Sequence, residues 1–152
     1  MSNEELIYRF EADPEDSFHH AHHVRLAFAY LCRYPVLQAL EKFASALKRY
    51  AAAREKPDRY HETITHAYFF LIRERMARLP GADWEGFTRE NPDLLEWKDG
   101  ILSRYYHEAT VKSDLAQRVR LPRPVAVIQG VPQLCLYLPS FNISGSQERG
   151  RR

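Results

Sequence analysis

One stretch of this sequence decides its fold class: VLQALEKFASALKRY, residues 36–50. Apolar side chains recur in it at steps of three and four residues, at Val36, Leu40, Phe43, Leu47 and Tyr50. An α-helix turns once in 3.6 residues, so this spacing places the apolar side chains on one face of a helix. We therefore predict an amphipathic helix that starts at Pro35, which suits the first turn of a helix, and that fades through the alanines at 51–53.

Two further long helices are predicted on either side of this stretch. The first has Asp13 as its cap and Pro14 at its first helical position, and it runs to about Arg33. The other runs from about residue 58 to residue 78 with an apolar stripe, and Pro80-Gly81 ends it.

The rest of the chain predicts smaller pieces. Short helical segments are expected at residues 84–90, at a single turn opened by Asn91-Pro92, at 97–106, and at 110–119 with Thr110 as cap. From residue 121 the composition changes to prolines and glycines among apolar residues, and residues 125–128 and 134–138 are short strands or extended segments. We predict an all-α helical bundle of three long and several short helices over residues 1–121, followed by an irregular C-terminal extension over residues 122–152.

The amino-acid composition limits the classes of function that this chain can have. The chain has 152 residues, which fits one domain, and a net charge of +2, which is too small to indicate a nucleic-acid or membrane-surface partner. Cys32 and Cys135 are too far apart to form a zinc motif. No signal peptide is visible at the N-terminus, and no apolar stretch has the ~18 residues of a membrane span, so a cytoplasmic location is expected.

The unusual feature is a group of histidines on two predicted helices. His19, His20, His22 and His23 fall within five positions. His19 and His23 are one turn apart and share a side of the helix, while the main apolar stripe lies roughly opposite. A helix that is apolar on two sides is expected to lie centrally in the bundle, with neighbours on both. His20 and His22 are interpreted as surface or structural residues.

The helix predicted over residues 58–78 adds His61 and Glu62. His61 falls on its apolar stripe, where it could meet the His19/His23 side of the first helix. Two histidines at i and i+4 with a third ligand from another helix can hold a metal and leave a position open. His19, His23 and His61 are the candidate metal ligands, and imidazole ligation suits zinc, iron, nickel or copper. The leading hypothesis is a helical bundle that binds a transition metal. Such a bundle could also be a small metalloenzyme that acts on a small molecule.

Other functions fit the same residues. A histidine oriented by Glu62 could act as a metal-free acid or base. A non-catalytic module could bind a small molecule or a protein through an aromatic-lined cavity, or the chain could form a homodimer through its tyrosine- and phenylalanine-rich faces. The metal hypothesis requires the imidazoles to converge, the binding module requires a cavity, and the dimer requires a large exposed apolar patch. The sequence does not decide whether this chain is an enzyme.

Two motifs also carry a resemblance. FHHAHHVRL (residues 18–26) followed by YHETIT (residues 60–65) resembles a family of small bacterial proteins with no known activity, over roughly residues 17–121. The resemblance implies a shared site at the positions that match the pattern: His19, His20, His23, Arg25, His61, Glu62 and Thr63. Glu62 and Arg25 are on that basis the candidate catalytic residues.

Overall fold

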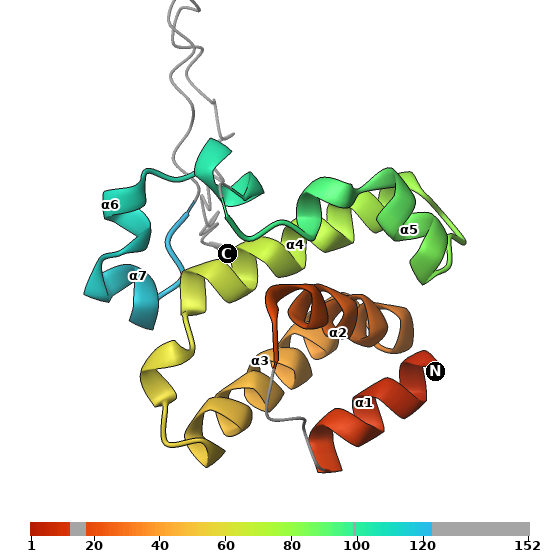
Figure 1. The fold of residues 1–152 in the computed structure, drawn as a ribbon, viewed down its shortest axis with the longest axis horizontal. Helices are drawn as coiled ribbons and strands as arrows, with labels where there is room; N and C mark the ends of the chain where they lie inside the picture. The colour runs from red at the N-terminus through yellow and green to blue at the C-terminus, as the bar shows by residue number, and fades with distance from the viewer. Residues whose placement is uncertain (13–17, 99, 123–152) are drawn as a thin grey trace, which may run out of the picture.

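The computed structural model describes residues 1–12, 18–98 and 100–122, and every regular element among them is helical. In chain order these elements are α1 (Asn3–Ala12), α2 (His20–Arg33), α3 (Val36–Ala53), η1 (Pro57–Arg59), α4 (Glu62–Arg78), α5 (Trp84–Glu90), η2 (Pro92–Leu94), η3 (Ile101–Arg104), α6 (Glu108–Val111) and α7 (Asp114–Arg118) (Figure 1). The predicted all-α class is confirmed for this part of the chain. None of its helices has both the length and the apolarity to span a membrane.

The centre of the bundle is α2, which packs against α1, α3 and α4. Its buried residues leave almost no gap along the sequence: Val24, Leu26, Ala27, Phe28, Ala29 and Tyr30 are each at most 2% exposed. Such a helix must be covered on several sides, because each exposed apolar side chain would forgo about 1.5–3 kcal/mol of burial. The prediction that this helix has neighbours on both sides is confirmed.

The long helices differ from their predicted bounds only at their starts. The helix α3 begins at Val36 directly after Pro35, as predicted. The helix α4 ends at Arg78 as predicted, but it begins at Glu62 because residues 57–59 form a separate 3₁₀ turn. His61 is its cap, and its ring Nδ1 accepts a hydrogen bond from the Ile64 N–H at 3.2 Å. The earlier helix was predicted to start at Pro14, but Phe18 and His19 are not helical and α2 starts at His20. The predicted cap and first residue, Asp13 and Pro14, lie outside the described residues.

Several short elements were predicted less well. The helix α1 was not predicted, although it buries Ile7 and Phe10 at helical spacing. A helix over residues 97–106 was wrong, since only η3 forms there. Gly100 precedes η3 in a tight turn that requires glycine, because a Cβ there would lie 2.6 Å from the Glu96 carbonyl oxygen. The expected helix over residues 110–119 is two pieces, because Ser113 caps α7 by accepting a hydrogen bond from the Ala116 N–H.

The segments around α5 are fastened to α4 by polar contacts. Trp84–Glu90 is helical as predicted, and the Asp83 side chain caps it by accepting from the Gly86 N–H at 2.8 Å. Arg75 of α4 donates to Asn91 at 2.9 Å and to Asp93 at 3.1 Å, on either side of Pro92. These bonds fix the position of the η2 turn, which contributes to the site described below.

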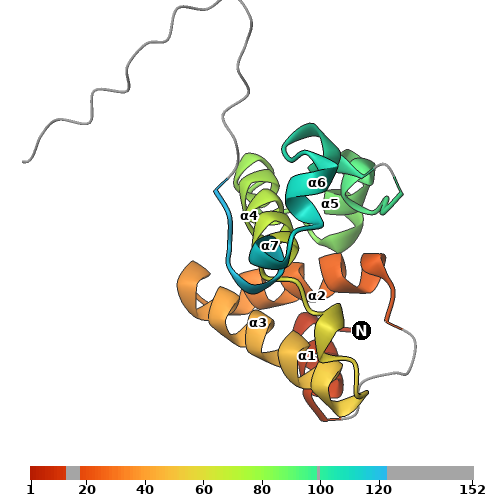
Figure 2. The same cartoon turned by 90° about the vertical axis from the view of Figure 1, so that its left-hand side faces the viewer.

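The last described residues are held against α4 by one threonine. Thr63 is 1% exposed, and its hydroxyl donates to the Val119 carbonyl at 2.8 Å and accepts from the Leu121 N–H at 3.0 Å. Figure 2 shows this segment running beside α4 and α7. The predicted irregular extension, including the segments at 125–128 and 134–138, lies outside the described residues from position 123 onward.

Replacing Thr63 with valine tests this clamp. The isosteric Thr63→Val change removes both hydrogen bonds, each of which contributes about 0.5–1.5 kcal/mol to the unfolding free energy. Urea unfolding followed by circular dichroism measures the loss. Thr110→Val, at a half-exposed threonine, is the matched control. Equal stability of the two variants would show that the threonine does not hold the segment.

Candidate functional site

A cavity of about 1030 Å³ lies among α2, α3, η1 and α4. This volume is at the upper end of the ~300–1,000 Å³ typical of small-molecule pockets. Its walls come from the first turns of α2, the second half of α3, the turn around η1 and the first half of α4, with Leu95 and Trp97 at one side. In Figure 1 the end of α3, η1 and the start of α4 follow one another along one side of the molecule.

The histidines expected to meet do line this one cavity. His19, His20 and His23 contribute from the start of α2, and His61 contributes from the cap of α4. A metal site requires more than a shared cavity, because the imidazole nitrogens must all lie within bonding distance of one ion. Among the described residues, no three histidine, cysteine, aspartate or glutamate side chains form a group that could hold an ion.

Both ring nitrogens of His61 are already engaged. Nδ1 accepts from the Ile64 N–H, and Nε2 lies 2.8 Å from the Val111 carbonyl oxygen. A carbonyl only accepts, so Nε2 carries the proton and the ring is the neutral Nε2–H tautomer. Ligation of a metal by His61 would therefore require the loss of one of these bonds.

His20, interpreted from the sequence as a surface or structural residue, is part of the cavity wall. Its Nε2 donates to the Leu94 carbonyl at 2.8 Å, and its ring lies 4.6 Å from the Tyr68 ring and 5.2 Å from the Trp97 ring. Burial lowers the pKa of His20. One signal was available in the sequence, because His20 and His23 are three residues apart and thus share a side of the helix.

His23 is the most strongly perturbed histidine of the site. It is half-buried, and its ring lies 4.4 Å from the Phe18 ring. Burial, with a smaller contribution from His20 and His22, lowers the pKa of His23 to about 4. The imidazole is therefore uncharged at neutral pH. His22 remains exposed, and its Nδ1 accepts from the His19 N–H at 3.2 Å as part of the helix start.

Aromatic rings form much of the remaining wall, together with an apolar floor. The rings belong to Phe18, Phe43, Tyr50, Tyr60, Tyr68 and Trp97. The Phe18 and Tyr50 rings are 5.3 Å apart, and the Tyr68 and Trp97 rings are stacked at 6.4 Å. The sequence placed Tyr50 on the apolar stripe of residues 36–50 and indicated no site role for Phe18, Tyr50 or Trp97, since nothing local distinguishes them from core aromatics.

The sequence offers four hydroxyl groups on the helices that carry the histidines or next to them, at Tyr30, Tyr60, Thr65 and Tyr68. Three of these residues line the cavity: Tyr60, Thr65 and Tyr68. The Tyr60 hydroxyl is buried and makes no hydrogen bond of good geometry to a described residue. Burial and the nearby Glu62 carboxylate raise its pKa, so the phenol stays protonated. Tyr30 instead lies in the core, where its hydroxyl donates to Glu11 at 2.6 Å.

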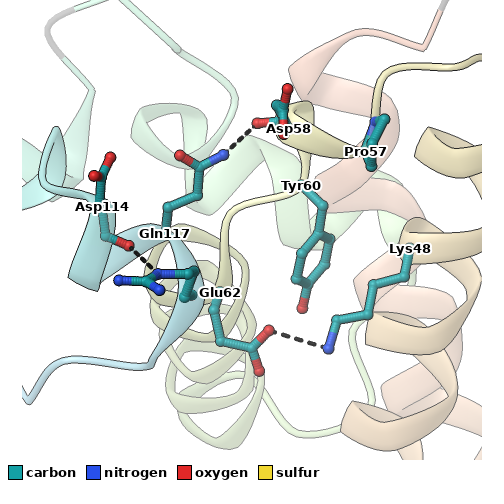
Figure 3. Close-up of a pocket in the computed structure, with 8 residues that line it drawn as sticks. Lys48, Pro57, Asp58, Tyr60, Glu62, Asp114 and Gln117 are labelled. Atoms are coloured by element: carbon teal, nitrogen blue, oxygen red, sulfur yellow. Dashed lines mark hydrogen bonds and ion pairs between the residues drawn. The ribbon is translucent and has the colours of Figure 1, made fainter.

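Glu62 belongs to a second, smaller pocket of about 540 Å³ next to the first (Figure 3). One carboxylate oxygen lies 3.2 Å from Lys48 Nζ and the other 3.2 Å from His66 Nε2. The histidine that Glu62 orients is thus His66, which is not in the wall of the large cavity. Tyr60 lines both pockets, and Figure 3 shows its hydroxyl directed toward the Lys48–Glu62 ion pair.

Arg25 lies apart from Glu62 and lines neither pocket. Its guanidinium donates to the Asn3 side chain at 2.6 Å and lies 5.0 Å from the Trp84 ring. These contacts join α1, α2 and α5, which is a structural role. The two candidate catalytic residues are therefore not brought together.

A scan against models of protein families, a search of curated proteins and a search of solved structures each return no match for this chain. The resemblance carried by residues 18–26 and 60–65 stays a prediction.

The lowered pKa of His23 predicts a loss of stability in mild acid. The folded-state pKa of about 4 lies below the ordinary 6.5, so the unfolded chain takes up the proton first as the pH falls. The contribution of His23 is complete above pH 6.5 and is lost progressively toward pH 4. Since one pKa unit corresponds to about 1.4 kcal/mol, the full loss is about 3 kcal/mol.

Urea unfolding at a series of pH values between 7.5 and 4 checks this. His23→Gln should flatten the pH dependence of the unfolding free energy, whatever it does to stability at pH 7.5. His107→Gln, at an exposed histidine, should leave the slope unchanged. An unaltered slope in His23→Gln would mean that His23 titrates normally in the fold.

Proposed function

We propose that this chain binds a small organic molecule in the cavity between α2, α3 and α4. The observation that carries the proposal is a space of about 1030 Å³ walled by aromatic rings and by imidazoles held neutral through burial. Binding sites for small molecules combine a concave, mostly apolar wall with a few polar groups that orient the ligand.

The polar groups of the cavity suit that role. An uncharged histidine offers one donor and one acceptor, and it costs far less to bury against a ligand than an imidazolium. His23 provides such a group beside Phe18.

Blocking the entrance is the direct test. Ala21 is exposed and lines the cavity, so Ala21→Trp adds bulk there at little cost to folding. We expect the wild-type chain to bind at least one of three naphthalene probes (2-naphthoate, 2-naphthamide and 2-naphthylmethylammonium) in isothermal titration calorimetry. Ala21→Trp should weaken that binding at least ten-fold.

Ala53→Trp is the matched control, since Ala53 is exposed at the end of α3 and does not line the cavity. It should bind as the wild type does. Binding that neither variant weakens would place the probe elsewhere on the chain, and absence of binding by all three probes would count against the proposal.

A transition metal is the second candidate, supported by the position of His19, His23 and His61 in one cavity wall. Zinc, iron, nickel or copper could be bound there by imidazole nitrogens, with His61 exchanging one hydrogen bond for the ion. Elemental analysis of chain purified without a histidine tag distinguishes the candidates. Near-stoichiometric metal that the double variant His23→Ala/His61→Ala lacks would support it. A metal-free chain that also fails to take up added zinc, nickel or iron would leave the organic ligand.

A further inference from the structure

The charged residues of the large cavity are gathered in one part of its wall. Arg54, Lys56, Asp58 and Arg59 all line it, within a stretch of six residues between the end of α3 and η1. Three of the four are cations. The rest of the wall consists of apolar, aromatic, hydroxyl, amide and imidazole side chains.

The way α3 ends explains why these cations face the same space. Glu55 adopts a left-handed conformation with φ 55°, the Glu55 N–H donates to the Ala52 carbonyl, and the Lys56 N–H donates to the Ala51 carbonyl. This pair of bonds is a Schellman motif, which reverses the chain at the end of a helix. The reversal brings Lys56 and Arg59 back to the cavity wall that Arg54 already lines.

Arg54 is held in place by an aromatic ring. It is half-buried, and its guanidinium carbon lies 3.9 Å from the centroid of the Tyr50 ring, which also lines the cavity. A guanidinium stacked on a ring keeps its planar set of N–H donors in a defined orientation. That geometry suits a carboxylate, which an arginine can bind through two parallel hydrogen bonds.

Among the described residues that line the cavity, cations outnumber carboxylates, since Asp58 is the one acidic side chain beside Arg54, Lys56 and Arg59. Glu62 faces the smaller pocket, where Lys48 and His66 contact its two oxygens. The described part of the wall thus has its cations in one region and uncharged, largely aromatic side chains in the remainder.

We propose that the ligand is an aromatic carboxylic acid, with its carboxylate at Arg54, Lys56 and Arg59 and its ring system between the aromatic side chains of the wall. This inference rests on the proposed function and specifies its ligand class. The carboxylate gains charge-assisted hydrogen bonds, and the ring gains apolar contacts with Phe18 and Tyr50.

A matched pair of probes tests the proposal on the full chain. 2-Naphthoate and 2-naphthamide differ in charge but hardly in shape. We expect isothermal titration calorimetry at constant ionic strength to show 2-naphthoate binding at least ten-fold more tightly. Arg54→Gln and Arg59→Gln should each reduce the ratio of the two affinities several-fold. Arg59 is exposed, so its variant is expected to fold normally.

Arg49→Gln is the control, because Arg49 is an exposed cation of α3 that does not line the cavity. It should preserve the preference for 2-naphthoate. Equal affinity for the two probes, with both blocked by Ala21→Trp, would overturn the anionic ligand but leave small-molecule binding intact. A preference that Arg54→Gln and Arg59→Gln do not reduce would also overturn it. Failure of both probes to bind would overturn the aromatic carboxylic acid, and failure of 2-naphthylmethylammonium as well would count against the proposed function.

Discussion

The burial of α2 is the constraint on which the rest of the structure depends. Between Val24 and Tyr30, six of seven residues are withdrawn from water. A helix with so wide an apolar surface needs partners on several sides, and α1, α3 and α4 provide them. The exception in that run, Arg25, is accommodated where α1 supplies Asn3 as a hydrogen-bond acceptor and α5 supplies Trp84 as a stacking surface.

The same constraint creates the cavity. The start of α2 lies before its fully buried run, and there the side chains of His19, His20 and His23 line the cavity. The wall opposite comes from the second half of α3 and the turn after it. One part of the cavity wall consists of neutral imidazoles and aromatic rings, and another part carries arginine and lysine. The two parts therefore differ in charge. That difference orients an amphipathic ligand more strongly than a uniformly apolar pocket would.

The polar contacts of Glu62 lie in the smaller pocket and not in the large cavity. Both of its carboxylate oxygens are occupied by cationic or hydrogen-bonding partners, Lys48 and His66. The Glu62 carboxylate on α4 therefore balances the charge of Lys48 on α3. Tyr60 lies next to this ion pair and lines both the smaller and the larger pocket. A histidine oriented by Glu62 exists, as one of the hypotheses from the sequence required, but it is His66 on the same helix and not one of the cavity histidines.

The sequence by itself determined the features that depend on residues close together along the chain. The spacing of apolar residues in 36–50 predicts α3, the two-sided apolar character of residues 19–32 predicts a central helix, and Asp83 predicts the start of α5. Only the tertiary structure decided the features that join distant segments: the His61 ring with the Val111 carbonyl, His20 with Leu94, and Arg25 with Asn3, at separations of 50, 74 and 22 residues. A helical periodicity places a side chain on a face, but the group that it meets there depends on how the helices pack. For this reason the histidines could be assigned to one region from the sequence, whereas the engagement of both His61 nitrogens and the gathering of Arg54, Lys56 and Arg59 at a cavity wall could not.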